Sequence, residues 1–156
     1  MTYANVVFSY GIERFCQKMV EGNVSGLILP DVPYEEKEEF DVVLKKHGLD
    51  LISMIAPTGH QRIQTIAKDA GGFIYCVSSL GVTGVRSSIT TDITAMVNLI
   101  REVTDVPVAV GFGISTPEQA EKMASQSDGA IVGSAIVKIV EKYGKDAPKY
   151  VEEYVK

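Results

Sequence analysis

Cysteine, histidine and basic charge are all scarce in this sequence. It has two cysteines and two histidines among 156 residues, a net charge of −5, and no lysine- or arginine-rich block. An acidic chain without a basic stripe is not expected to bind nucleic acid or an anionic membrane. No signal-peptide pattern, apolar run of about 18 residues or low-complexity tract is present. The composition, 46% hydrophobic and 22% charged, predicts one ordinary soluble domain.

The cysteines and histidines form no metal or catalytic pattern. Cys16 and Cys76 lie in apolar helix-like and strand-like segments without the spacing of metal ligands. We therefore expect reduced core residues of a cytoplasmic protein, with no metal and no cofactor. His60 has no aspartate, cysteine or second histidine nearby, and His47 falls at the end of a predicted helix, where it would cap.

Short apolar runs alternate with amphipathic helical patterns along the chain. The runs at 24–29, 49–56, 73–78, 106–110 and 129–132 predict buried parallel strands, and residues 1–8 resemble the end of another strand and its loop. Six successive βα units predict an α/β fold with a parallel sheet. A (β/α)8 barrel needs eight units and roughly 250 residues, so this would be an incomplete barrel. Its unpaired first and last strands would favour self-association, unless the chain is a piece of a longer one.

Two glycine-rich junctions near the C-terminus carry the clearest functional signal. The strand at 106–110 runs into Gly111-Phe112-Gly113, and Thr116-Pro117-Glu118-Gln119 then has the N-cap, first-turn proline and capping-box glutamine of a helix start. The strand at 129–132 runs into Gly133-Ser134, where Ser134 is able to cap the next helix. Two such junctions side by side would place free N–H groups and two positive helix ends at one edge of the sheet. This arrangement predicts a phosphate site without a basic residue.

Parts of this pattern are also typical of other kinds of junction. Either glycine turn alone is an ordinary connection in a parallel sheet. Gly111-Phe112-Gly113-Ile114-Ser115-Thr116 matches the first two glycines of a dinucleotide-binding fingerprint, but the third glycine and an acidic residue about 20 positions later are missing. Two successive junctions fit better the phosphate site that barrel enzymes build after their last two strands. The loop that contains Gly81 and Gly84 is a candidate lid.

Three glycine motifs in register make the sequence resemble the α chain of tryptophan synthase. They are Gly81-Val82-Thr83-Gly84, the stretch from Gly111 to Gln119, and Gly133-Ser134-Ala135-Ile136-Val137. Three further segments agree in order and spacing: Met1-Thr2-Tyr3-Ala4-Asn5, Leu29-Pro30-Asp31-Val32-Pro33 and Ala56-Pro57-Thr58. The resemblance covers essentially the whole chain.

The resemblance implies a fold, an activity and a partner. The fold is a (β/α)8 TIM barrel, of which residues 1–156 would be a single domain made of strands 3 to 8. The activity is a lyase step of tryptophan biosynthesis, the retro-aldol cleavage of indole-3-glycerol phosphate to indole and glyceraldehyde 3-phosphate. The partner is the PLP-dependent β chain, which receives the indole within an α2β2 assembly.

Particular residues also acquire roles through the resemblance. The donors that hold the substrate phosphate match Gly84, Gly113, Gly133 and Ser134. The residues around the indole ring and the catalytic carboxylates match Tyr3, Tyr75, Thr83 and Phe112, with Thr83 on the closing lid. For the two tyrosines, strand packing is the alternative that residue type alone favours. Surfaces that face the β chain match Asn5 and the loop Asp31-Val32-Pro33.

The sequence departs from the family pattern in two ways. Val6 stands where many members have proline, a change in a loop that touches no chemistry. The family's general acid/base glutamate and the aspartate that orients the indole N–H lie in the first two βα units, so no catalytic residue is assigned here and the 156 residues alone are expected to be inactive. One alternative is a non-catalytic partial barrel that binds phosphate or a partner. Another is a different phosphate-binding barrel, such as a phosphoribosyl isomerase, although the candidate Cys76 lies within a strand rather than at its end.

Overall fold

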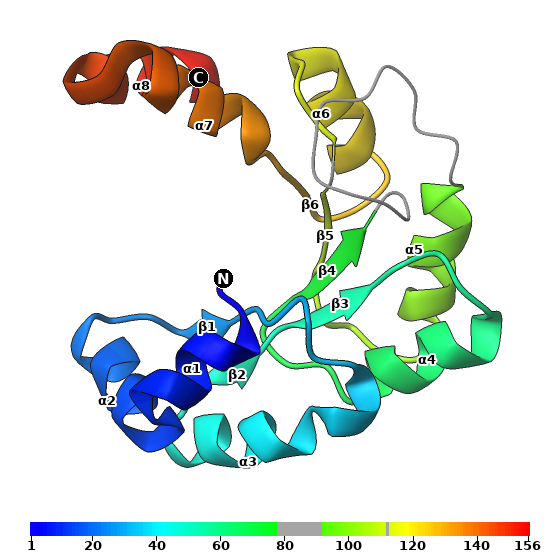
Figure 1. The fold of residues 1–156 in the computed structure, drawn as a ribbon. Coiled ribbons are helices and arrows are strands. Elements are labelled where there is room, and N and C mark those ends of the chain that lie inside the picture. The colour runs from blue at the N-terminus through cyan, green and yellow to red at the C-terminus, as the bar shows by residue number, and fades with distance from the viewer. Residues whose placement is uncertain (78–91, 112) are drawn as a thin grey trace.

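Parallel strands alternate with helices along an open arc (Figure 1). The computed structural model describes residues 1–77, 92–111 and 113–156. The strands are β1 (Gly26–Leu27), β2 (Asp50–Leu51), β3 (Ser53–Ile55), β4 (Ile74–Val77), β5 (Val108–Gly111) and β6 (Gly129–Ile131). The helices are α1 (Ala4–Tyr10), α2 (Ile12–Glu21), α3 (Glu38–Lys46), α4 (His60–Lys68), α5 (Ile93–Arg101), α6 (Pro117–Ala124), α7 (Ser134–Tyr143) and α8 (Ala147–Val155), with 3-10 turns η1 (Tyr34–Glu36) and η2 (Gly144–Asp146).

The strands pair in chain order, and every pairing among the described residues is parallel. β1 pairs with β2, and β3, β4, β5 and β6 follow one another in a second sheet. Only Ile52 separates β2 from β3, and its N–H donates to the carbonyl oxygen of Leu27 at 2.8 Å. The predicted strand at 49–56 is therefore one bent strand that pairs first with β1 and then with β4. A strand order without reversal is that of a barrel rather than a doubly wound sheet.

The two faces of this sheet bury different residues. Ile55, Cys76 and Val110 are register partners on β3, β4 and β5. Their side chains pack against α4 and α5 on the convex face, and the residue before each of them faces the other side of the sheet. The other face carries Tyr75 and Val77 and forms a smaller cluster that includes Ile131. A third cluster holds α1, α2 and α3 against β1. Since burying an aliphatic side chain contributes about 1.5–3 kcal/mol, the convex cluster supplies most of the packing energy.

The amino-terminal segment differs from the prediction. The sequence predicts a strand end and a loop for residues 1–8, but α1 begins at Ala4 and ends at Tyr10, and its C-cap Gly11 has φ +88°. One ladder-like bond remains, because the Thr2 N–H donates to the Ile28 carbonyl oxygen at 3.2 Å. Burial of Val7 in the cluster with α2 and α3 favours the helix over the predicted strand end and loop. With β2 and β3 counted as one, the described residues form five strands rather than six.

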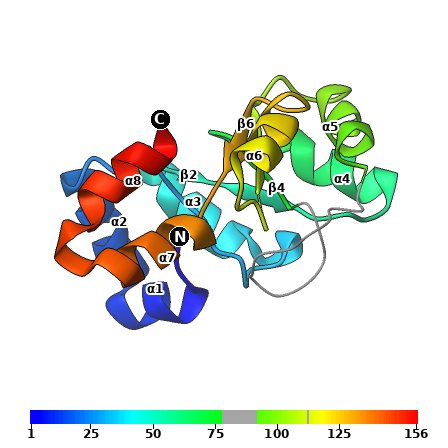
Figure 2. The ribbon, with the colours of Figure 1, turned by 90° about the horizontal axis from the view of Figure 1, so that it is seen from above.

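The last two helices form a hairpin set apart from the sheet. The rings of Tyr143 and Tyr150 stack at 3.6 Å between centroids, and no residue of α7 is buried. In both views α7 and α8 lie on the side of the molecule that carries α1 and α2, across from α4 and α5 (Figures 1 and 2). The Tyr154 hydroxyl donates to the Ser115 carbonyl oxygen at 3.1 Å and ties the hairpin to the turn before α6.

Candidate functional site

The turn between β5 and α6 is held by its own side chains. Gly113 has φ +81°, a conformation that glycine adopts without strain. The predicted capping box is confirmed: Thr116 Oγ1 accepts the Gln119 N–H at 3.3 Å, and Gln119 Oε1 accepts the N–H groups of Ser115 and Thr116 at 2.9 and 3.3 Å. These three N–H groups are therefore already bonded. An anion at this turn would depend on the main chain around Gly113 rather than on the start of α6.

The turn between β6 and α7 is more open. Gly133 is the N-cap of α7 and is exposed, and a Cβ added there would meet nothing within 4 Å. The prediction that Ser134 caps this helix is wrong, because Ser134 is its first residue and no side-chain cap bond forms. The start of this ten-residue helix therefore has no side-chain cap, and its first N–H groups and partial positive charge lie beside Gly133.

Strand register brings the two turns to one edge of the sheet. Gly111, the last residue of β5, lies opposite Ile131, the last residue of β6. Adjacent strands are about 4.8 Å apart, so the segments that leave them begin as close neighbours. Gly113 and Gly133-Ser134 therefore share the carboxyl edge, as the sequence predicted. Gly84 and Thr83, with their candidate lid, and Phe112 lie outside the described residues.

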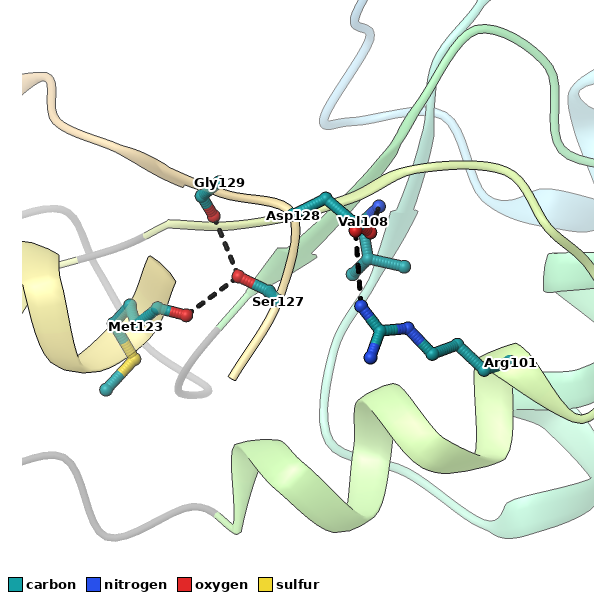
Figure 3. Close-up of polar contacts among 6 residues, drawn as sticks. All are labelled: Arg101, Val108, Met123, Ser127, Asp128 and Gly129. Atoms are coloured by element: carbon teal, nitrogen blue, oxygen red, sulfur yellow. Dashed lines mark hydrogen bonds and ion pairs between the residues drawn. The ribbon is translucent and has the colours of Figure 1, made fainter. Parts of the chain in front are cut away.

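This register is fixed at the opposite end of the strands (Figure 3). The Asp128 N–H donates to the Val108 carbonyl oxygen at 2.8 Å, and Asp128 Oδ2 accepts the Val108 N–H at 2.9 Å. The other carboxylate oxygen is 3.2 Å from Arg101 Nη2. The Ser127 hydroxyl lies 2.8 Å from the Met123 carbonyl oxygen and 2.9 Å from that of Gly129, which joins the end of α6 to β6. The Val108 N–H, helped by Arg101, lowers the pKa of the Asp128 carboxyl.

Tyr75 lies on the concave face of the sheet, near the carboxyl ends of the strands. It is 9% exposed, and Met54 and Ala109 are its register partners on β3 and β5. Its ring passes over Gly111 so closely that a Cβ there would lie 2.7 Å from Tyr75 Cζ and overlap the hydroxyl. Burial raises the pKa of Tyr75, so the ring presents a neutral phenol at physiological pH. Tyr75 thus packs in the sheet, as residue type alone favours.

A cavity of about 490 Å³ lies between the segments that follow β1 and β3, and Tyr75 itself is not among its lining residues. Met54 and Val77, which flank Tyr75, line it together with apolar residues at the strand ends. Its two cations have acidic neighbours: Lys37 Nζ is 3.6 Å from Asp69, and Arg62 Nη1 is 2.6 Å from Glu35. A cavity of this size with apolar walls and paired charges suits a flat uncharged ring better than an anion.

The other two candidate residues from the sequence, Tyr3 and Cys76, lie away from this cavity. Tyr3 is the N-cap residue of α1 and is 61% exposed, and it does not line this cavity. Cys76 points to the convex core, and burial raises its pKa to about 12. A thiol in that position is protonated at neutral pH and faces away from the concave side, which is against the isomerase alternative.

Sequence reasoning missed Met54 and Val77 as parts of the candidate site, and it missed the contact of Gly111 with the Tyr75 ring. Their signal is the inward alternation along three strands in register, which needs the pairing partners as well as the strands. Among the described residues, no group of three or more His, Cys, Asp or Glu side chains is placed to hold a metal ion. In that same part of the chain, no helix has the length and apolar character to cross a membrane.

The fold is that of a parallel βα protein of the barrel class, with two glycine turns at its carboxyl edge. Residues 1–156 match, over their whole length, the family described as tryptophan synthase alpha chain. The chain therefore belongs to the tryptophan synthase alpha chain family, as the motifs indicated.

Individual relatives agree with this assignment. The tryptophan synthase alpha chain of Lacticaseibacillus casei is 47% identical over 156 residues, which are 100% of this chain and 59% of that one. The alpha chain of Lactiplantibacillus plantarum is 51% identical over 141 residues, 90% of this chain and 53% of that one. The chain thus spans about three fifths or less of the length of these curated relatives.

Solved structures show the same likeness. The alpha subunit from Campylobacter jejuni superposes with a TM-score of 0.86 at 32% identity. The matched region covers 99% of this chain and 62% of the Campylobacter jejuni subunit. A subunit of the tryptophan synthase α2β2 complex from Pyrococcus furiosus has a TM-score of 0.84 at 28% identity, with coverage of 99% and 63%. These likenesses confirm the predicted incomplete TIM barrel.

Proposed function

We propose that this chain supplies the phosphate grip and part of the ring pocket of an α-chain lyase that cleaves indole-3-glycerol phosphate. The observation that supports this most directly is the β5–β6 register, with Gly111 opposite Ile131 and both glycine turns leaving one edge. Main-chain N–H groups at Gly113 and Gly133, with the Ser134 hydroxyl, would hold the phosphate dianion. The cavity between the segments that follow β1 and β3 would take the indole ring.

Binding and proton transfer are divided in this proposal. Retro-aldol cleavage needs a proton delivered to the indole carbon and another removed from the glycerol hydroxyl, and a positioned carboxylate typically supplies about 10²–10⁴-fold for each transfer. By the family resemblance, those carboxylates belong to the first two βα units of the family, which residues 1–156 do not match. Tested by itself, the chain would behave as the non-catalytic alternative does, binding phosphate without turnover.

Complementation tests the activity. A polypeptide with the first two βα units of the Lacticaseibacillus casei alpha chain would be mixed with this chain, and indole release from indole-3-glycerol phosphate would be followed by chromatography. We expect indole from the mixture and none above background from either part alone. Turnover by the 156 residues alone within tenfold of an intact α chain would contradict the division of labour.

A charge placed in the open turn tests the phosphate grip. Gly133→Asp puts a carboxylate where a Cβ meets nothing within 4 Å, so the turn is expected to keep its shape. Two negative charges about 4 Å apart near a protein surface repel by about 4 kcal/mol, so inorganic phosphate should bind at least tenfold more weakly by NMR titration. Gly59→Asp is the matched control, because Gly59 is likewise an N-cap with open space around it, at the start of α4. Equal weakening by both substitutions would refute the assignment of the phosphate to Gly133.

We also propose that a PLP-dependent β chain is the protein partner, with a cytoplasmic location for the assembly. A related alpha subunit comes from an α2β2 complex, and both thiols of this chain are buried and unpaired. Asn5 and the loop Asp31-Val32-Pro33, which the resemblance places at that interface, belong to segments joined by a hydrogen bond from the Ala4 N–H to Asp31. Calorimetric titration with a β chain should show binding that Asn5→Arg weakens, and unaltered heats with that variant would argue against this surface.

A further inference from the structure

The segment around Tyr3 is tied to the β1–η1 loop by hydrogen bonds on both sides of this residue. The Thr2 N–H donates to the Ile28 carbonyl oxygen at 3.2 Å. The Ala4 N–H lies 3.1 Å from each carboxylate oxygen of Asp31. Tyr3 sits between these two bonds, and its own side chain makes no cap bond. Both acceptors, the Ile28 carbonyl oxygen and the Asp31 carboxylate, belong to the next βα unit. The position of the Tyr3 backbone therefore depends on residues outside its own segment.

Asp31 supplies a capping acceptor to a helix whose first N–H, that of Ala4, lies 27 residues away in sequence. α1 has seven residues, none of them acidic in the first turn, and helices this short are not stable alone. The first N–H groups of a helix need acceptors, and a carboxylate at this end also meets the favourable end of the helix dipole. Asp31 satisfies both needs, since the N-cap residue Tyr3 provides no side-chain cap.

We propose that Asp31 is a positioning residue, which holds Tyr3 at the carboxyl edge of the sheet through its bond to the Ala4 N–H. The relevance of this position to a bound ring rests on the proposed function, whereas the bond itself does not. Tyr3 is 61% exposed and is not fixed by packing, so its backbone anchors decide where its ring lies. An acceptor of the right length at position 31 is therefore required to keep the backbone of Tyr3 in this place.

Amide NMR on the whole chain tests the bond directly. In Asp31→Ala, the Ala4 amide proton should shift and exchange with solvent about fivefold faster, the change expected when a capping interaction is lost. The Tyr3 ring signals should move with it. Asp31→Asn, which keeps one oxygen acceptor, should lie between the alanine variant and the wild type. Asp105→Asn, at an exposed residue before β5, is the control for loss of a negative charge and should leave both signals in place.

Ligand titration separates a positioning role from a general structural one. In Asp31→Ala, the dissociation constant for indole should rise about fivefold while that for inorganic phosphate stays the same, because the phosphate turns follow β5 and β6. Unchanged Ala4 and Tyr3 signals in Asp31→Ala would overturn the proposal even if phosphate binds. Equal weakening of indole and phosphate would also overturn it, as a general loss of structure. Absence of phosphate binding to the wild type would instead refute the proposed function and leave the amide result to judge Asp31.

Discussion

Gly111 is the position where one added methyl group should disturb the site most. Its Cβ would lie 2.7 Å from Cζ and 2.8 Å from Cε1 of Tyr75, distances that real contacts do not reach. Tyr75 is buried between strands and cannot simply swing into solvent. Overpacking a close-packed core costs about 1–3 kcal/mol, and we expect Gly111→Ala to fall in the upper half of this range. Because φ at Gly111 is not positive, backbone strain adds nothing to this cost.

Urea unfolding followed by circular dichroism measures this cost, and two further variants isolate its cause. Gly129→Ala adds the same methyl group in β6, where the nearest atom is Ala109 Cβ at 4.0 Å. That control should be neutral or stabilising by about 0.4–1 kcal/mol, through the lower entropy of the unfolded chain. Adding Tyr75→Val to Gly111→Ala should recover at least about 1 kcal/mol relative to the sum of the single changes. If Gly111→Ala is as stable as Gly129→Ala, or if the two changes are additive, the close approach of the Tyr75 ring is refuted.

Three further predictions concern charge, thiols and assembly. The folded pKa of Asp128 is lowered, so its bonds contribute stability above its unfolded pKa of about 4, and this is lost as the pH falls through the folded value. The thermal midpoint should therefore fall on acidification less steeply in Asp128→Asn than in the wild type or in Asp105→Asn, and equal slopes would contradict this. Cys16 and Cys76 are buried, and burial raises both pKa values, so a thiol reagent at pH 8 should label neither until urea unfolds the chain; rapid labelling of native Cys76 would place it elsewhere. Within the described residues β6 pairs only with β5, so light scattering should detect dimers that depend on concentration, whereas a monomer at every concentration would exclude association through this edge.

Local signals were sufficient to predict the strands and the start of α6. Thr116, Pro117 and Gln119 are each favoured at their helical positions by chemistry that acts within four residues, and the capping box formed as expected. Apolar runs also predicted five strands, because parallel strands that are covered on both faces are apolar along their whole length. Ser134 was misplaced by one position, because Gly133 and Ser134 are both acceptable N-caps and only the backbone decides between them.

Contacts between distant segments produced the features that could not be predicted. α1 depends on Asp31 and on burial of Val7, neither of which is visible within residues 1–10. The bend at Ile52 depends on a strand that changes partners, while the sequence shows one continuous apolar run. In the site, Gly113 and Gly133 were predictable from turn chemistry alone. Met54 and Val77 joined the candidate site, and Gly111 came under the Tyr75 ring, only through the pairing of β3, β4 and β5.

The two ends of the sheet are therefore expected to have separate roles, so substitutions at Asp128 and at Gly133 should affect different properties. At the amino end, Asp128 holds Val108 from both its main chain and its side chain, and this sets which residue of β6 faces which residue of β5. At the carboxyl end, the same register brings Gly111 opposite Ile131, so the turns that contain Gly113 and Gly133 leave neighbouring strands at one edge. Asp128→Ala removes only the side-chain bond and keeps the main-chain bond to Val108 and the β5–β6 pairs, so it should lower stability by about 1 kcal/mol and leave the proposed anion site in place. Gly133→Asp should do the reverse, with an unchanged free energy of unfolding and a lost affinity for phosphate, as expected of a barrel whose function resides at one end.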